Sequence, residues 1–548
     1  MAKLSVDQAL LKAKSHAKKG EFEDAQKLYQ VVLQAFPKNK RAQKGLTALN
    51  KPKQPATTQS PPQDTINQLI DLYNQGQLAA VAKQAQVLTE QYPDAFIIWN
   101  ILGAAHKGSG NTFEASEAFK KVTELNPNYA DGHSNLGITL KDQDKLEEAI
   151  VSFNRALSLN PDHAEAYNNM GNALKLQGKL DEAIVSYNKA LFLEPDYVDA
   201  INNMGSALKE QGKLEEAIEV FNKALDIKPD YADTYFKASF VYNLRGEIQK
   251  GLEFYEWRLI NKDTKSRPPR ERLFWNGFES IEGKKFFVYE EQGLGDIIQF
   301  CRYLPILVKH GATVTFMVRK KLHALLSTLG NEIILVDTLP DESQIDFEAP
   351  LMSLPHLLNT SLETIPSLES YLSADYLRVV SWGKLLGAKK FKIGICWQGS
   401  KSEIDVGRSF PLSLFEGISK APNVELISLH KGEGEHQIKD ISFDLTTCGS
   451  DFDVGQDAFL DTAAVMMNCD LIITSDTAVA HLAGSLGCET WLILKYVPDW
   501  RWMLNRPDSP WYPTMTLYRQ KTPGNWEDVF TSVEQKLLSK LNEGKKYE

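Results

Sequence analysis

The chain has 548 residues, and at about 150 residues per domain this length predicts three or four domains. Hydrophobic residues make up 43% of the sequence and charged residues 24%, which excludes a disordered or fibrous chain. The formal net charge of −10 argues against nucleic acid as a partner.

The five cysteines lie far apart and form no CxxC pair, so they predict neither a disulfide framework nor a zinc site. The first residues lack the apolar stretch of a secretion signal, and no apolar run reaches about 18 residues. We therefore expect a cytoplasmic protein without a transmembrane segment.

Residues 1–50 predict an N-terminal helical hairpin similar to the repeat hairpins that follow, because Gly20, Ala25, Tyr29 and Pro37 stand in the same relative positions as the repeat residues described below. This hairpin holds ten basic and four acidic residues, which fits either an ordinary solvated surface or a docking surface for an acidic partner. Residues 51–63 (KPKQPATTQSPPQ) are rich in proline, serine and threonine, and they predict a flexible linker.

Residues 64–262 carry an internal repeat. Prolines, glycines, alanines and aromatic residues each recur every 34 residues, and four residue classes in one register make coincidence negligible. The glycines are Gly103, Gly137, Gly171 and Gly205, and the aromatic residues are Phe119, Phe153, Tyr187, Phe221 and Tyr255. This pattern resembles the tetratricopeptide repeat (TPR). The resemblance implies an α-solenoid of helical hairpins whose concave face holds an extended partner.

Three asparagines recur on the same period, two positions before a repeat glycine: Asn135, Asn169 and Asn203. A side-chain amide can donate to and accept from a peptide backbone, so the three residues could bind a polypeptide acceptor without reading its sequence. They could equally be tolerated polar residues of the inner helices. A similar asparagine ladder in the repeats of protein O-GlcNAc transferases favours peptide binding.

The second half alternates short apolar strands with helical stretches, after a connector at residues 263–283. The predicted strands are KKFFVYEE, TVTFMV, EIILVDT, FKIGICW, VELISLH, CDLIITS and ETWLIL. Strands that are apolar on both faces and alternate with helices predict parallel sheets covered on both sides. We expect two Rossmann-like α/β domains, residues 284–388 and 389–548, with ligands beyond the carboxyl ends of the strands.

The loop QGLGD at residues 292–296 lies between a predicted strand and a helix. Gly293 and Gly295 permit a tight turn and the close approach of a ligand to the backbone. Asp296 stands at the helix start, where it could be a general base for an acceptor hydroxyl or simply a helix cap.

The loop after FKIGICW contains Gln398, Lys401 and Arg408. Cations near a strand end suit a diphosphate, and a guanidinium can bind it through two donors, although surface charges on a loop explain them as well. His430 and Lys431 follow VELISLH and could line the base or ribose pocket of a nucleotide. The acidic residues and histidines near them lack metal-ligand spacing, so no metal is predicted.

The segment CDLIITSDTAVAHLAG joins a buried strand to a helix of small residues. Ser475, Asp476, Thr477 and Ala478 lie where that helix begins, so free backbone N–H groups and the helix dipole could hold phosphate oxygens. His481 lies on the same helical face as Thr477 and could bind the ligand or be a packed structural histidine.

These loops resemble glycosyltransferase family 9, the ADP-heptose heptosyltransferase group, over residues 284–530. The GLGD turn with Leu304-Pro305 downstream matches the family's amino-terminal motif, and the resemblance gives Asp296 the role of catalytic base. Asp476 to His481 matches its D-[ST]-G-x-x-H motif, except that Ala478 replaces the glycine. Arg408 before Phe410-Pro411 stands where the family has a phosphate-binding lysine. These two departures leave the donor sugar open.

The resemblance implies a two-domain GT-B fold, inversion at the anomeric carbon and no required metal or cofactor besides the nucleotide-sugar substrate. Together with the repeats, it predicts a glycosyltransferase that moves a sugar to a hydroxyl of a protein held by the solenoid, a plan similar to that of protein O-GlcNAc transferases. Two alternatives stay open at this point. One is a heptosyltransferase-like enzyme with a glycan or lipid-linked acceptor, and the other is a TPR scaffold with a vestigial transferase domain.

Overall fold

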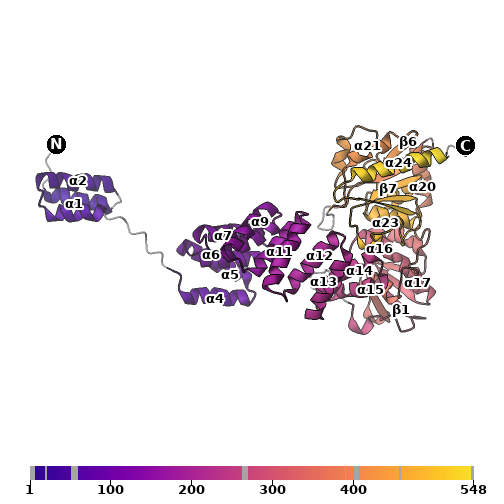
Figure 1. The fold of residues 1–548 in the computed structure, drawn as a ribbon, viewed down its shortest axis with the longest axis horizontal. Coiled ribbons are helices and arrows are strands. Elements are labelled where there is room, and N and C mark those ends of the chain that lie inside the picture. Colours follow the sequence, from indigo (N-terminus) through magenta and orange to yellow (C-terminus); the bar gives the residue numbers. More distant parts are fainter. Residues whose placement is uncertain are drawn as a thin grey trace. The chain divides into compact units, whose positions relative to one another are not determined.

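The computed structural model describes residues 6–18, 21–50, 60–261, 269–388, 390–399, 407–455 and 458–544. The chain divides into two compact units, residues 1–161 and 162–548 (Figure 1). The second unit contains the last helical hairpins together with all the strands of the described residues.

The first half is helical throughout its described residues. Its helices are α1 (Val6–Lys18), α2 (Phe22–Ala35), α3 (Lys40–Asn50), α4 (Gln63–Asn74), α5 (Leu78–Gln91), α6 (Phe96–Gly108), α7 (Thr112–Leu125), α8 (Ala130–Asp142), α9 (Leu146–Leu159), α10 (Ala164–Leu176), α11 (Leu180–Leu193), α12 (Val198–Glu210), α13 (Leu214–Ile227), α14 (Ala232–Arg245) and α15 (Ile248–Tyr255). The predicted α-solenoid is confirmed.

Two details at the beginning of the chain extend the sequence analysis. The predicted hairpin is present as α1 and α2, and a third helix, α3, follows it within the described part of residues 1–50. Helix α4 begins at Gln63, directly after Pro62, so the last residue assigned to the linker is helical. Residues 51–59 of that predicted linker lie outside the described residues.

Glycine and an aromatic residue meet at the seam of four repeat hairpins, those that contain Gly103, Gly137, Gly171 and Gly205. A Cβ atom on Gly171 would lie 2.5 Å from Tyr187 Cε1, and one on Gly205 would lie 2.7 Å from Phe221 Cζ. Both aromatic side chains are buried. The period of 34 therefore reflects a packing requirement, since only glycine lets the first helix of a hairpin approach the ring on the second.

The second half contains two parallel sheets, as predicted. The four-stranded sheet has the order β3-β2-β1-β4, and the five-stranded sheet has the order β6-β5-β7-β8-β9, with every neighbouring pair parallel. The strands are β1 (Lys285–Tyr289), β2 (Thr313–Met317), β3 (Ile333–Val336), β4 (Phe347–Pro350), β5 (Phe391–Cys396), β6 (Val424–Ser428), β7 (Leu471–Ser475), β8 (Thr490–Leu494) and β9 (Met515–Arg519).

Helices separate these strands. They are α16 (Leu294–Phe300), α17 (Leu304–Lys309), α18 (His323–Leu326), α19 (Leu354–Leu357), α20 (Tyr376–Leu386), α21 (Glu416–Ser419), α22 (Leu460–Met466), α23 (Ala478–Ser485) and α24 (Glu527–Gly544). Strands β7 and β8 are buried along their whole length, as expected for central strands covered on both faces. The predicted closing helix corresponds to α24.

Strands β4 and β9 were not predicted. The sequence of β4, FEAP, interrupts its apolar residues with Glu348 and ends in a proline. Glu348 is nevertheless fully buried, because Arg270 forms an ion pair with its carboxylate. A buried charge with its partner 78 residues away leaves no local pattern to recognise.

Within the second unit, the last repeat hairpin contacts segments that follow individual strands of each sheet. Helix α15 and the 3₁₀ helix η1 (Glu256–Leu259) lie beside α19 and the turn η7 (Leu351–Ser353), which follow β4. Helix α14 packs against η11 (Trp500–Trp502), which follows β8, and Leu504 N donates to Leu244 O at 3.3 Å. The end of the repeat array thus lies next to the carboxyl ends of strands from both sheets.

Candidate active site

Polar residues follow four neighbouring strands of the five-stranded sheet. The order β6-β5-β7-β8 brings together the loops that begin after Ser428, Cys396, Ser475 and Leu494. The sequence analysis assigned candidate ligand residues to three of these four loops. The parallel arrangement therefore assembles them at one edge of the sheet, which is where ligands of such sheets bind.

Cys396, His430 and Thr477 meet at the centre of this edge. The Cys396 sulfur lies 3.5 Å from His430 Nδ1 and 3.9 Å from Thr477 Oγ1. The Trp397 ring stacks on the His430 ring with centroids 4.1 Å apart. Burial lowers the pKa of His430. Its Nε2 lies 2.5 Å from the Glu433 carbonyl oxygen, so both ring nitrogens already have partners within the protein.

Two other predicted ligands are already engaged by the protein. Gln398 accepts a hydrogen bond from Gln437 Nε2 at 3.1 Å, and the ammonium of Lys431 donates to the Phe452 carbonyl oxygen. The side chain of Lys431 therefore supports the loop before α22, which differs from the expected contact with a nucleotide. Lys401 lies outside the described residues.

Arg408 lies against the end of β5. A Cβ atom on Gly399 would be 3.0 Å from Arg408 Nη2 and 3.4 Å from Thr477 Cγ2. The guanidinium therefore lies beside the beginning of α23, although it comes from a loop after β5. The glycine at position 399 leaves the space that Arg408 occupies.

The beginning of α23 combines an unsatisfied hydroxyl with a carboxyl group. Ser475 Oγ is buried and has no hydrogen-bond partner among the described residues. Burial and the neighbouring Asp499 raise the pKa of Asp476 to about 6, against the opposing effect of Arg408 and Arg501. Because Ala478 is the first residue of the helix, its N–H and those that follow it are not all used inside the helix.

His481 is packed between the two sheets. Its Nδ1 lies 2.9 Å from the Tyr512 hydroxyl, and its ring stacks on Trp502 with centroids 5.3 Å apart. Burial lowers the pKa of His481 well below its usual value. On the other side, a Cβ atom on Gly295 would be 2.8 Å from His481 Cδ2. These contacts match the structural alternative for His481, which the sequence analysis kept open.

Asp296 is both a helix cap and part of an ion pair. It is the third residue of α16, and its Oδ2 accepts a hydrogen bond from Gly293 N at 2.9 Å. Its Oδ1 accepts from Arg501 Nη2 at 2.5 Å. The side chain stays 20% exposed, and each carboxylate oxygen has a second lone pair, so an acceptor hydroxyl can still reach it.

Sequence reasoning missed Arg501. This buried residue also donates to Gln299 Oε1 at 2.6 Å and to Asp499 Oδ1 at 2.8 Å, so it links the five-stranded sheet to helix α16 of the other sheet. The sequence PDWRW carries a signal, since an arginine between two tryptophans after a buried strand is poorly suited to a solvated loop. Its partners, however, lie up to 205 residues away.

The repeat asparagines pair with asparagines of the preceding hairpin. In the first unit Asn135 Nδ2 donates to Asn100 Oδ1 at 3.3 Å, and in the second unit Asn203 Nδ2 donates to Asn168 Oδ1 at 3.0 Å. Asn169 is partly buried. These pairs include Asn100 and Asn168, which the sequence analysis did not assign, and Asn168 also donates from Nδ2 to the Tyr197 hydroxyl at 3.3 Å.

Two searches of the described residues have negative results. No group of three or more histidine, cysteine, aspartate or glutamate side chains is arranged to hold a metal ion in that part of the chain. Within the same residues, every helix is too short or too polar to cross a bilayer.

Family models match the helical half of the chain. The family model described as "TPR repeat" matches residues 139–178, 171–212 and 205–246, and models described as "Tetratricopeptide repeat" match residues 9–39, 97–129 and 118–151. Protein FlbA of Caulobacter vibrioides (strain ATCC 19089 / CIP 103742 / CB 15) is 26% identical in an alignment 286 residues long, and the match covers 47% of this chain and 47% of FlbA. The chain thus spans about half the length of this relative.

Solved structures resemble parts of the chain. The crystal structure of MamA is 27% identical, with 28% of this chain and 91% of that chain covered and a TM-score of 0.26. The structure of PilW, titled a widely conserved type IV pilus biogenesis factor, is 17% identical, with 38% and 97% covered and a TM-score of 0.35. The family matches, together with the helical hairpins, establish that the N-terminal region carries tetratricopeptide repeats.

Proposed function

We propose that this chain is a glycosyltransferase that moves a sugar from a nucleotide-diphosphate sugar to a hydroxyl group of a protein bound by the repeats. In this proposal the two parallel sheets are the two lobes of a GT-B fold. One observation carries it: the turn with Asp296 lies against the beginning of α23. A Cβ atom on Gly295 would be 3.5 Å from Ala478 Cα, so a carboxylate and a helix N-terminus from different sheets share one site.

The donor side of the proposal uses the edge of the five-stranded sheet. Arg408, the unpartnered hydroxyl of Ser475 and the N–H groups at the start of α23 are donors that suit the oxygens of a diphosphate. The His430 ring is stacked on Trp397 and both its nitrogens are engaged by the protein, so in this proposal it offers a ribose or base an aromatic contact instead of a hydrogen bond. The net charge of −10 makes such local donors necessary, because the chain offers no general positive field.

The proposed reaction needs one base and stabilisation of one leaving group. The acceptor oxygen attacks the anomeric carbon and forms the new glycosidic bond, while the bond from that carbon to the phosphate oxygen breaks. The nucleoside diphosphate leaves with the electron pair, and Arg408 with the start of α23 stabilises its charge. Asp296 takes the proton of the acceptor hydroxyl. Attack from the face opposite the leaving group inverts the anomeric carbon.

The repeats provide the acceptor side. In the second unit, Asn169 and Asn203 belong to α10 and α12, the first helices of successive hairpins, and amides at this regular spacing suit the backbone of an extended polypeptide. Asn135 has the corresponding place on α8 of the first unit. A protein acceptor therefore agrees with both halves of the chain. A glycan or lipid-linked acceptor would leave this repeated polar surface without a role in the reaction.

A second candidate function is a TPR scaffold whose sheets no longer catalyse transfer. The observation that favours it is the engagement of the proposed site within the protein, since both Asp296 oxygens accept hydrogen bonds and His481 is packed. A scaffold predicts that no nucleotide sugar is consumed, which separates it from the transferase.

A calorimetric titration of the full chain with UDP, GDP, ADP and CMP tests donor binding. We expect one nucleoside diphosphate to bind and Arg408→Gln to weaken that binding about tenfold or more, because hydrogen bonds to charged groups contribute about 1.5–3 kcal/mol. Arg506→Gln is the matched control, since Arg506 pairs with Asp508 instead. Absence of binding by all four nucleotides, or equal loss in both variants, would contradict the proposed donor site.

Mass spectrometry distinguishes the acceptors. Proteins from cells with and without the chain should differ in sugar-modified peptides if the acceptor is a protein. A difference confined to glycans or lipids would replace the protein acceptor by the alternative, while leaving the donor site unaffected.

A further inference from the structure

The last repeat departs from the pattern of the others at its seam. The glycine series that contains Gly171 and Gly205 would continue at position 239, where Ser239 stands instead. The aromatic partner of that position is Tyr255, which continues the series of Tyr187 and Phe221. At the seams of α10 with α11 and of α12 with α13, the ring lies directly against the glycine. Tyr255 is thus the aromatic residue of the hairpin in which serine replaces the glycine.

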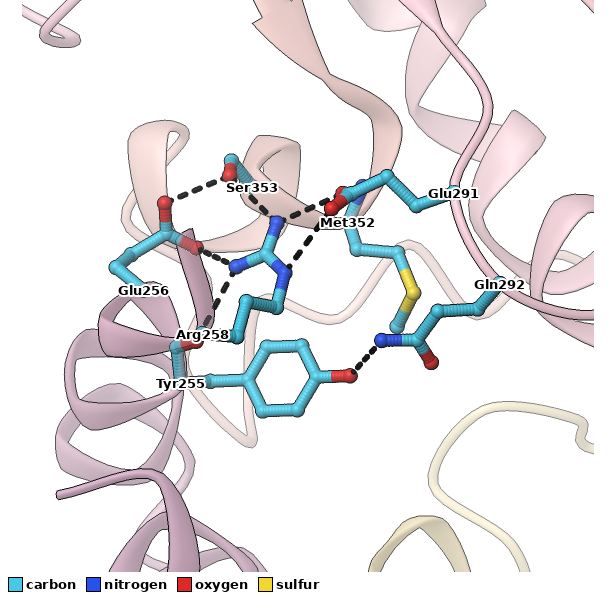
Figure 2. A network of polar contacts seen from close by, with 7 residues as sticks. All are labelled: Tyr255, Glu256, Arg258, Glu291, Gln292, Met352 and Ser353. Carbon is cyan, nitrogen blue, oxygen red and sulfur yellow. Dashed lines mark hydrogen bonds and ion pairs between the residues drawn. The ribbon is translucent and has the colours of Figure 1, made fainter. Parts of the chain in front are cut away.

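Tyr255 contacts the proposed active-site loop. Its hydroxyl accepts a hydrogen bond from Gln292 Nε2 at 2.6 Å (Figure 2). Its ring lies against Trp500, with centroids 6.1 Å apart. Burial raises the pKa of Tyr255 above its usual value, so the hydroxyl stays protonated. One repeat side chain thus touches both the turn that leads to Asp296 and the residue before Arg501.

Gln292 has a backbone conformation that needs support. Its φ is +52°, in the left-handed region that residues other than glycine, asparagine and aspartate seldom adopt. Its carbonyl oxygen accepts from Arg319 Nη2 at 3.2 Å, and its side chain is held by Tyr255. The next residue, Gly293, supplies the N–H that binds Asp296. The conformation of Gln292 therefore sets the direction in which the turn enters α16.

The residue before Gln292 is held by the same end of the repeat array. Arg258 has no exposed surface and donates from Nη2 to Glu291 Oε2 at 2.8 Å and to Ser353 Oγ at 2.8 Å. From Nη1 it donates to Glu256 Oε1 at 2.7 Å. Figure 2 shows these residues and the Tyr255 hydrogen bond on one side of the loop. Glu291 and Gln292 are thus fixed by repeat residues and not only by their own sheet.

We infer that Tyr255 is a positioning residue: its hydroxyl holds Gln292 in the left-handed conformation and so orients the turn that carries Asp296. This inference rests on the proposed function for its catalytic consequence, since Tyr255 acts through Gln292 and Gly293 and does not touch the reacting groups. Its structural part, that the hydroxyl stabilises the turn, stands apart from any activity.

Amide hydrogen exchange of the full chain tests the structural part. In Tyr255→Phe we expect the amides of Gly293 and Ile297, which close the turn, to exchange about fivefold faster, the equivalent of one hydrogen bond of about 1 kcal/mol. Tyr187→Phe is the matched control, because it removes a hydroxyl bonded to Asn172 Oδ1 at the same repeat position. Unchanged exchange in Tyr255→Phe, or the same increase in Tyr187→Phe, would overturn the inference.

Gln292→Gly provides a second variant. Glycine adopts the left-handed conformation without strain, so the turn no longer depends on the tyrosine hydroxyl. In this background Tyr255→Phe should leave exchange at Gly293 and Ile297 unchanged. An undiminished effect would mean that Tyr255 acts by another route and would also overturn the inference.

Kinetics test the catalytic part once a nucleotide sugar is found to be consumed. Tyr255→Phe should lower kcat about fivefold or more and leave the KM for the nucleotide sugar unchanged, since the donor site lies on the other sheet. Tyr187→Phe should change neither constant. A chain that consumes no nucleotide sugar but shows the expected exchange would refute the proposed function while supporting the positioning of the turn. Normal exchange together with normal kcat would refute the positioning alone.

Discussion

Arg501 donates a hydrogen bond to Asp296 at 2.5 Å. The proposed base, on α16 after β1 of the four-stranded sheet, is thus paired with a cation from the segment after β8 of the five-stranded sheet. All three nitrogens of the guanidinium are used, because Asp499 and Gln299 accept the remaining hydrogen bonds. This ion pair holds the turn with Asp296 against the edge where the donor site is proposed.

Arg501→Gln should destabilise the chain by about 3–5 kcal/mol at pH 7, because it leaves two partly buried carboxylates without their cation. Urea unfolding followed by tryptophan fluorescence measures this cost. Arg506→Gln, which breaks an exposed pair with Asp508, should cost at most about 1 kcal/mol. Equal costs for the two variants would be inconsistent with this pairing.

Gly295→Ala should destabilise the chain by about 1–3 kcal/mol. The new methyl group would lie 2.8 Å from the His481 ring, which cannot retreat because Tyr512 and Trp502 hold it. Gly293→Ala is the control. Its φ is −85°, and its Cβ would meet nothing within 4 Å except the movable carboxylate of Asp296 at 3.2 Å. Thermal denaturation of the two variants should therefore differ, and similar melting temperatures would contradict the close approach of α16 to α23.

Asp476→Asn should stabilise the chain at high pH. The folded-state pKa of about 6 lies above the ordinary value of about 3.9, so ionising Asp476 in the folded state costs roughly 1–3 kcal/mol. The free energy of unfolding contributed by this group therefore falls as pH rises from about 4 to 6 and is level above. The variant should gain about that amount at pH 7.5 and almost nothing at pH 4. A difference between variant and wild type that is the same at both pH values would argue against the raised pKa.

Arg258→Leu should be more damaging than the double variant Arg258→Leu/Glu291→Leu. The single change leaves Glu291, whose side chain is 3% exposed, without its cation, at a cost of about 3–5 kcal/mol. The double change removes both charges and should recover part of that loss. Denaturation monitored by circular dichroism gives both values. A double variant that equals the sum of its two single variants would show that the pair is not coupled.

The helical half could be predicted because its pattern is local. Glycine and the aromatic ring at these seams are 16 positions apart, and their contact recurs in four hairpins. The parallel sheets could also be predicted, since strands such as β5 and β7 are continuous apolar runs. Because ligands of parallel sheets bind beyond the carboxyl ends of the strands, the sequence also predicted that Gln398, His430 and Thr477 lie at one edge of a sheet.

The interactions that fix the site could not be predicted. Arg501 and its partner Asp296 are 205 positions apart in the sequence, and Arg258 and its partner Glu291 are 33 apart. Neither pair belongs to a periodic pattern that the sequence could reveal. Lys431 illustrates the same limit, because its place after β6 suggests a ligand, whereas its ammonium is bound by the Phe452 carbonyl. Where a long side chain points depends on partners that only the fold supplies.

Transfer of a labelled sugar by wild type and Asp296→Asn tests the central claim most directly. The assay mixes the full chain with the nucleotide sugar that it binds, labelled in the sugar, and with total protein from cells that lack this chain. We predict transfer to protein by the wild type and a rate lower by about 10²–10⁴-fold in Asp296→Asn, with donor affinity unchanged. Full transfer by Asp296→Asn would contradict the role of Asp296, and no transfer by the wild type from any nucleotide sugar would contradict the proposed glycosyltransferase.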